Sequence, residues 1–156
     1  MFPPQNPNLK PESMWNYEIA FSQKLMDGRL SYGVNLFYID GKNLIMTLPN
    51  PNGSGQINLN SGKIDNTGVE VQTAYRINQA WSVNGNYSFL HMENPVVAAP
   101  EHKLYAGANF MQGRWNLSTG VQYIAGLYTS TDPAVTESFV LWNLRASFRA
   151  ARWLDI

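Results

Sequence analysis

Two histidines are the residues of this chain best suited to bind a metal ion or an iron chelate. His91 and His102 flank one polar stretch, and Glu93 and Glu101 lie beside them. Imidazole and carboxylate groups bind transition metals, but nothing in this spacing fixes their geometry as a set of ligands. We therefore interpret all four as solvated loop residues. The chain contains no cysteine, so a thiolate metal site is excluded.

The remaining reactive groups give no pattern of catalysis. Serines are frequent, but the spacing of a nucleophile elbow or a catalytic triad is missing, as are Walker and dinucleotide-binding loops. Glu18 and Glu70 fall on the polar side of alternating segments, where a water-filled space tolerates carboxylates freely. We predict that the chain is not an enzyme, with no catalytic residue, resident metal or cofactor.

An alternation of apolar and polar residues predicts the elements that position these side chains. Residues 15–40 show it most clearly, as two alternating arms joined by Asp27-Gly28, a pair suited to a tight hairpin turn. A two-residue period is that of a strand with one apolar and one polar face. The same period predicts further strands at 66–76, 81–90, 102–111, 115–124 and 139–149, and the start of another at 152–156.

The predicted connections alternate between short and long, which indicates an all-β, antiparallel up-and-down meander. The long loops are expected at 41–65, 91–101 and 126–137, although residues 42–48 could extend the first hairpin. Ligand recognition is expected from these loops and from polar side chains inside the strands, namely Gln72, Asn84, Asn86 and Gln122. Loops on a rigid scaffold are common places for binding residues.

Several features indicate that the apolar face meets lipid. Charged residues make up only 14% of the chain, against about a quarter in typical soluble proteins. Strands of roughly ten residues match the 9 to 11 or so that cross a bilayer at a tilt. Three tryptophans begin strands just after short turns, at the level of an aromatic girdle: Trp81, Trp115 and Trp153. We therefore predict transmembrane β-strands with lipid as a partner.

The charges are also divided between the two edges of the predicted sheet. Arginines gather at the short turns, at Arg29, Arg76, Arg114, Arg149 and Arg152. Acidic residues gather at the long loops, at Glu12, Asp40, Asp65, Glu93, Glu101, Asp132 and Glu137. The net charge of zero argues against a nucleic-acid partner. The chain has neither an apolar run long enough for a membrane-spanning helix nor the pattern of a secretory signal at its start.

The segment before the first hairpin resembles a known family. Residues 6–12, NPNLKPE, followed by Asn16-Tyr17-Glu18, resemble the N-P-x-L-K-P-E and x-Y-E pattern in the C-terminal half of TonB-dependent outer-membrane receptors. Three weaker stretches fit the same family, at 66–70 (NTGVE), 100–103 (PEHK) and 152–155 (RWLD). The resemblance covers nearly the whole chain.

Similarity to that family implies a 22-stranded barrel in the bacterial outer membrane, of which this chain would be a partial transmembrane β-barrel with outer-membrane lipid as a partner. It also implies a periplasmic plug and TonB-powered import of a ferric siderophore, haem, cobalamin or glycan. On this basis residues 1–156 are expected to be a single barrel fragment, about strands 14 to 20, without the plug. Unpaired edges would make such an isolated fragment self-associate. The alternatives are a passive porin or structural outer-membrane barrel, and a soluble carbohydrate-binding β-sandwich with its tryptophans scattered.

Overall fold

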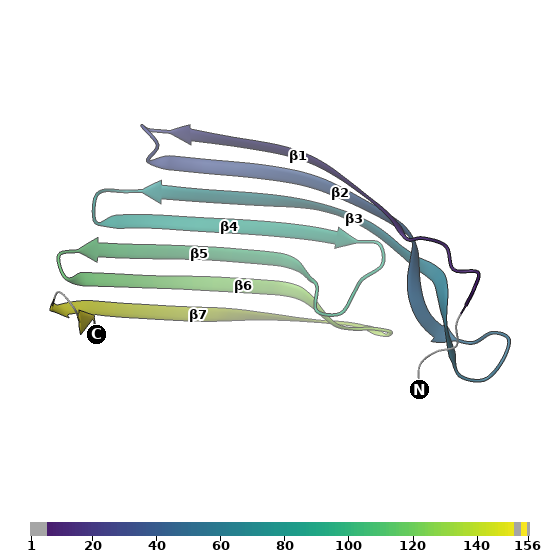
Figure 1. Cartoon of the computed structure of the whole chain (residues 1–156). Helices are drawn as coiled ribbons and strands as arrows, with labels where there is room; N and C mark the ends of the chain where they lie inside the picture. The colour runs from purple at the N-terminus through teal and green to yellow at the C-terminus, as the bar shows by residue number, and fades with distance from the viewer. Residues whose placement is uncertain (1–5, 152–153, 156) are drawn as a thin grey trace.

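The chain forms antiparallel strands, each paired with the strand before it. The structure, a computed structural model, describes residues 6–151 and 154–155. Its strands are β1 (Ser13–Leu25), β2 (Leu30–Pro49), β3 (Gln56–Arg76), β4 (Trp81–Met92), β5 (Pro100–Gln112), β6 (Trp115–Thr131), β7 (Ala134–Ala151) and β8 (Leu154–Asp155). They follow one another in space as in sequence (Figure 1). The predicted all-β, up-and-down meander is confirmed.

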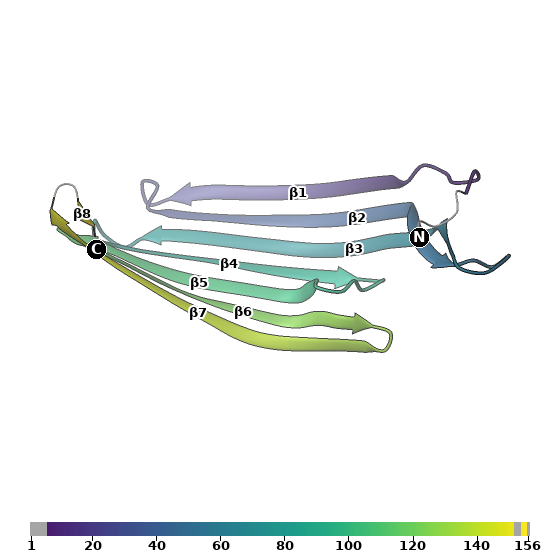
Figure 2. The ribbon, with the colours of Figure 1, turned by 60° about the horizontal axis from the view of Figure 1, so that its bottom comes forward.

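The strands form one curved layer, and no second layer covers either face in the described part of the chain (Figures 1 and 2). Met92 is the single buried hydrophobic residue in the described ranges, whereas Ile19 is 75% exposed and Trp142 is 69% exposed. A soluble sandwich would enclose such side chains between two sheets, so that alternative is wrong. The described residues contain no helix long and apolar enough to cross a membrane.

The strands extend further at the long-connection edge than the alternation predicts. Most of the predicted loop 41–65 is strand, because β2 continues to Pro49 and β3 begins at Gln56, so the predicted extension over 42–48 is confirmed. The loop 126–137 is likewise almost entirely β6 and β7, and 91–101 shortens to the stretch between Met92 and Pro100. Apolar alternation marks a strand only where one face is apolar, and here polar and apolar residues occur on both faces, as at Ile45 and Met46 in β2.

The extended hairpin of β2 and β3 bends where its register shifts. The pairing is irregular between Gly41 and Leu44 and again between Leu44 and Ile45. Extra residues on one strand of a pair increase the local twist and bend the strand. Figure 1 shows the ends of β2 and β3 turning away from the rest of the sheet, beside the N-terminal segment.

The short turns have the backbone conformations that their residues favour. Met26, Asp27 and Gly28 have φ angles of 54°, 53° and 79°, the positive values for which an Asp-Gly pair is suited. Gly113, between β5 and β6, has φ 61°. Asn78 stabilises the turn between β3 and β4, since its Oδ1 accepts hydrogen bonds from the backbone nitrogens of residues 80 and 81, both at 2.8 Å. These turns set the pairing of each hairpin.

The register places the apolar side chains of seven strands in continuous rows. The central row joins Phe21, Val34, Val71, Tyr87, Leu104, Tyr123 and Val140. Successive side chains of a strand point to opposite faces, so the polar row beside it lies on the other face: Ser22, Gly33, Gln72, Asn86, Tyr105, Gln122 and Leu141. The sheet therefore has one apolar face and one polar face.

Successive hairpins are displaced along the strands by a constant step. One row joins Leu30, Tyr75, Val83, Ala108 and Thr119. The first turn closes at Leu30 in this row, β4 begins two residues before Val83, and β6 begins four residues before Thr119. One residue per strand is about 3.4 Å against a strand spacing of about 4.8 Å, which gives a tilt of about 35°. That tilt is typical of closed barrels.

Candidate functional site

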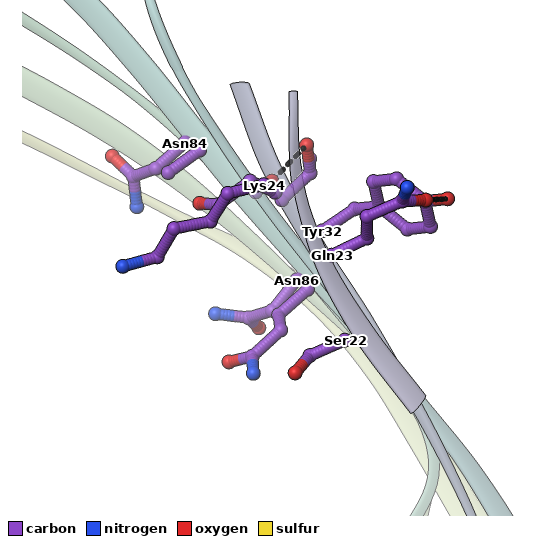
Figure 3. Close-up of a pocket in the computed structure, with 11 residues that line it drawn as sticks. Ser22, Gln23, Lys24, Tyr32, Asn84 and Asn86 are labelled. Carbon is purple, nitrogen blue, oxygen red and sulfur yellow. Dashed lines mark hydrogen bonds between the residues drawn. The ribbon is translucent and has the colours of Figure 1, made fainter. Parts of the chain in front are cut away.

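Polar side chains from β1 to β4 surround a hollow on the polar face. The hollow has a volume of about 640 Å³, and its lining includes Ser22, Lys24, Gln72, Asn84 and Asn86. In Figure 3, Asn84 and Asn86 lie on the opposite side of the ribbon from Gln23 and Tyr32. The structure thus brings together three of the four polar strand residues that the sequence singles out.

Gln122, the fourth predicted residue, lies on the same face but away from this hollow. It occupies the same row as Gln72 and Asn86, and Tyr105 of β5 separates it from Asn86. The aromatic ring of Tyr105 lies across two glycine backbones: a Cβ added at Gly107 would be 2.9 Å from its Cζ, and one added at Gly120 would be 2.8 Å from its Cε2. The glycines make room for this ring, which covers the wall beside Gln122.

A second hollow on the polar face, of about 500 Å³, contains opposite charges. Asn35, Glu70, Ser88 and Lys103 line it and occupy one row across four strands. Glu70 and Lys103 are two strands apart, about 10 Å, and they form no ion pair within the described residues. The Oδ1 atom of Asn35 is buried without a hydrogen-bond partner among the described residues, and such an acceptor is costly unless a donor reaches it.

Sequence reasoning placed Glu70 correctly on the polar face but missed the contributions of Asn35 and Lys103. Both residues lie on the polar side of their predicted strands, so alternation carried the signal. What alternation lacks is the register between strands, which aligns Asn35, Glu70 and Lys103 in one row.

Two polar groups on the apolar face have hydrogen-bond partners on that same face. Tyr32 Oη donates to Gln23 Oε1 at 2.7 Å, which satisfies the one glutamine that interrupts the apolar side of β1. Trp142 Nε1 donates to Thr119 Oγ1 at 2.8 Å, and this hydroxyl donates to the carbonyl of Asn143 at 3.0 Å. A polar group in hydrocarbon needs such a partner, because no water is present to replace it.

Aromatic pairs mark the short-turn edge of this face. Trp81 packs against Phe110, and Trp115 packs against Phe148, each with ring centroids 4.8 Å apart. The row of paired residues that contains Trp81 reaches β6 at Leu117, and Trp115 lies two residues nearer the short-turn edge than Leu117. That offset equals the stagger of two strands, so both rings lie at one height in a tilted barrel. The predicted girdle holds for these two tryptophans, whereas Trp153 and Arg152 lie outside the described residues.

We predicted from the sequence that His91, His102, Glu93 and Glu101 are solvated loop residues. The structure contradicts this prediction for three of them, which lie in strands: His91, His102 and Glu101. His91 lies exposed in β4, and His102 is half-buried in β5, where its Nδ1 is 2.9 Å from Tyr87 Oη and its ring is 5.0 Å from that of Phe89. Glu101 accepts a hydrogen bond from Tyr128 Oη at 2.7 Å. The described residues include no group of three potential metal ligands.

Residues of the NPNLKPE segment hold the extended hairpin of β2 and β3. Asn60 Oδ1 accepts the backbone N–H of Lys10 at 2.7 Å, and Asn60 Nδ2 donates to the carbonyls of Lys10 and Asn43 at 2.9 and 2.6 Å. Glu12 Oε1 accepts the backbone N–H of Ile45 at 2.7 Å. The residues that carried the family resemblance therefore fix the position of the hairpin that extends beyond the apolar band.

Two lysines offset part of the acidic charge at this edge. Asp40 and Asp65 lie opposite each other on β2 and β3. Lys42 Nζ is 2.8 Å from Asp40, and Lys63 Nζ is 3.1 Å from Asp65. The hydrogen bond from each lysine to its aspartate raises the pKa of the lysine. The acidic edge predicted from the sequence is therefore neutralised where these strands meet.

The chain is similar in fold to large outer-membrane receptors. The siderophore receptor PiuA from Acinetobacter baumannii aligns with a TM-score of 0.79 and 16% identity over 97% of this chain and 24% of that chain. The ferric-catecholate import receptor Fiu from E. coli K12 aligns with a TM-score of 0.70 and 23% identity over 96% of this chain and 23% of that chain. The copper transporter OprC aligns with a TM-score of 0.72 and 13% identity over 94% of this chain and 25% of that chain.

These alignments show that the chain spans about a quarter of the length of the solved structures it matches. A comparison with curated protein sequences finds no match. The model of a family described as TonB dependent receptor-like, β-barrel, matches residues 1–154. That match extends over the meander, both of its faces and the N-terminal motif, and by it this chain belongs to the family of TonB-dependent receptor β-barrels.

Proposed function

We propose that this chain forms part of the wall of an active transporter in the bacterial outer membrane. The transporter imports a large scarce nutrient, such as a ferric siderophore, haem, cobalamin or a glycan, with energy from the TonB complex. One observation carries the proposal: the register gives the sheet one apolar face and one face with free amides, where Gln72, Asn84 and Asn86 bond to no described residue. The first face suits lipid, and the second suits water and a polar cargo.

The polar face would act as a surface on which a cargo exchanges hydrogen bonds. Free amide groups both donate and accept, so a passing ligand replaces water on them with little change in free energy. Glu70 and Lys103 add one charge of each sign within the same row. A face with many weak hydrogen-bonding groups lets a cargo move along it, whereas a single tight binding site would hold the cargo in place.

We also propose that residues 1–156 form one continuous segment of the barrel, with the plug supplied by other parts of the parent polypeptide. The outer edge of β1 has no partner strand in the described chain, and an open edge is not tolerated in a bilayer. Neighbouring strands of the complete barrel would pair there. The isolated segment would instead self-associate through its free edges.

Uptake by whole cells tests the function. Two of the similar structures are a siderophore receptor and a ferric-catecholate import receptor, which makes iron-loaded siderophores the first cargo to measure. Cells that express the complete receptor should accumulate labelled iron from a catecholate siderophore under iron limitation, and deletion of TonB should abolish that uptake. If small solutes enter equally with and without TonB, the chain belongs to a passive channel.

If iron uptake is absent, the same assay with haem, cobalamin and oligosaccharides extends the test across the proposed cargo classes. Accumulation that requires TonB for any of them supports active import. The absence of TonB-dependent accumulation for all of them would overturn the proposed function.

A further inference from the structure

The N-terminal segment and the extended hairpin enclose a pocket rich in asparagine. The pocket has a volume of about 660 Å³, within the range of small-molecule sites. Its lining consists of Asn6, Asn8, Lys10, Asn43, Asn50, Pro51, Asn52, Ile57, Leu59, Asn60 and Ser61. Six of these eleven residues are asparagines, and only Asn50 and Asn52 belong to the turn between β2 and β3.

The asparagines divide into residues that build the pocket and residues that face solvent. Asn6, Asn50 and Asn60 are half-buried, and their side chains bond to neighbouring backbone: Asn6 Nδ2 donates to the carbonyl of residue 58 at 2.9 Å, and Asn50 Oδ1 accepts from the N–H of residue 52 at 3.0 Å. With the bonds of Asn60, these contacts fix the walls of the pocket.

The other three amides remain available to a ligand. Asn8, Asn43 and Asn52 are exposed, and their side chains form no hydrogen bond within the described residues. Asn43 has a φ angle of 60°, a conformation that asparagine adopts more readily than most residues. Free amides on a fixed frame present paired donors and acceptors at set positions.

We infer that this pocket binds an uncharged carbohydrate. Each amide offers an acceptor and two donors, which matches the hydroxyl groups of a sugar, and the apolar side chains Ile57 and Leu59 offer contact to its C–H groups. Lys10 is the single charged residue in the described lining, which is too little positive charge to hold a polyanion, and the lining has no carboxylate to hold a cation. The inference rests on the proposed function in one respect, namely that the long-connection edge of the sheet faces the outside of the cell.

The direct test is binding of the complete receptor, in detergent, to an array of neutral and acidic oligosaccharides. Wild type should bind a subset of neutral oligosaccharides. The double variant Asn8→Ala/Asn52→Ala should bind them about tenfold more weakly, because several hydrogen bonds of about 1 kcal/mol each are lost. Both residues are exposed and unpaired, so the variant should fold normally. Asn116→Ala, an exposed asparagine at the opposite edge, is the matched control and should bind like wild type.

Two sources of carbohydrate are separable. If cells take up the bound oligosaccharide and this requires TonB, it is a cargo. If they bind it without uptake, the pocket holds a cell-surface glycan. The absence of binding to any neutral oligosaccharide, or equal binding by the double variant, would overturn the inference. In that case TonB-dependent uptake of another nutrient would still support the proposed function, so the two failures are distinguishable.

Discussion

The two faces of this sheet differ in the polar groups that they carry. On the apolar face these are few, and two of them are paired: Gln23 bonds to Tyr32, and Trp142 bonds to Thr119. On the polar face, the amides of Gln72 and Asn86 form no bond to the described residues. The difference shows that burial is a poor guide here, since both faces are open, and that the residue types in the paired rows distinguish the faces.

The largest expected effect comes from placing a charge on each face at adjacent positions. Val71→Arg puts a charge at the middle of the apolar face and should destabilise the complete barrel by about 2 to 4 kcal/mol, as for arginine at the bilayer midplane. Gln72→Arg, one residue along on the polar face, should change stability far less. Urea unfolding in lipid vesicles measures both. Equal losses for the two variants would contradict the assignment of faces.

A smaller loss is expected from removing one acceptor on the apolar face. Thr119→Val keeps the shape of the side chain but leaves the Trp142 indole N–H unpaired, which should destabilise the barrel by about 1 to 3 kcal/mol. Ser118→Ala on the polar face is the control, because Ser118 bonds to no described residue. The same unfolding experiment applies. If both variants lose equally little, water reaches Trp142 and its face is not in lipid.

The extended hairpin tests the comparison beyond the apolar band, where both faces carry a mixture of polar and apolar residues. Asn60→Ala removes the bonds to Lys10 and Asn43, and local opening should become easier by about 1 kcal/mol, without global unfolding. Hydrogen exchange at the Lys10 amide should accelerate about fivefold. Asn66→Ala, lower on β3, is the control and should leave that exchange unchanged. Unaltered exchange in Asn60→Ala would mean that other contacts hold the segment.

The smallest effect on stability is expected on the polar face itself. The double variant Gln72→Ala/Asn86→Ala should stay within about 0.5 kcal/mol of wild type, because neither side chain has a described partner, yet it should weaken cargo uptake. Val71→Ala should show the opposite pattern, with lower stability and unchanged uptake per folded receptor. Quantitative uptake assays combined with unfolding measurements check both. A double variant with normal uptake would show that cargo does not use these amides.

Sequence alternation was sufficient wherever one face is apolar. It located the central part of every strand through β7 and the Asp27-Gly28 turn, and it placed Gln72, Asn84 and Asn86 on one face. It failed at the long-connection edge, where consecutive apolar residues at 44–46 of β2 and an irregular register interrupt the period. The bond between Glu12 and Ile45 was beyond prediction for a different reason, since it joins segments whose relative position depends on the hairpin bend.

By itself, the sequence determined the strand period, the two faces, the tight turns and the family motif. These properties depend on neighbouring residues, whose side chains must alternate about an extended backbone. Only the tertiary structure decided the step of one residue per strand, the row of Asn35, Glu70 and Lys103, and the asparagine pocket. Each depends on pairing between strands, and a slip of one residue would turn every side chain to the other face.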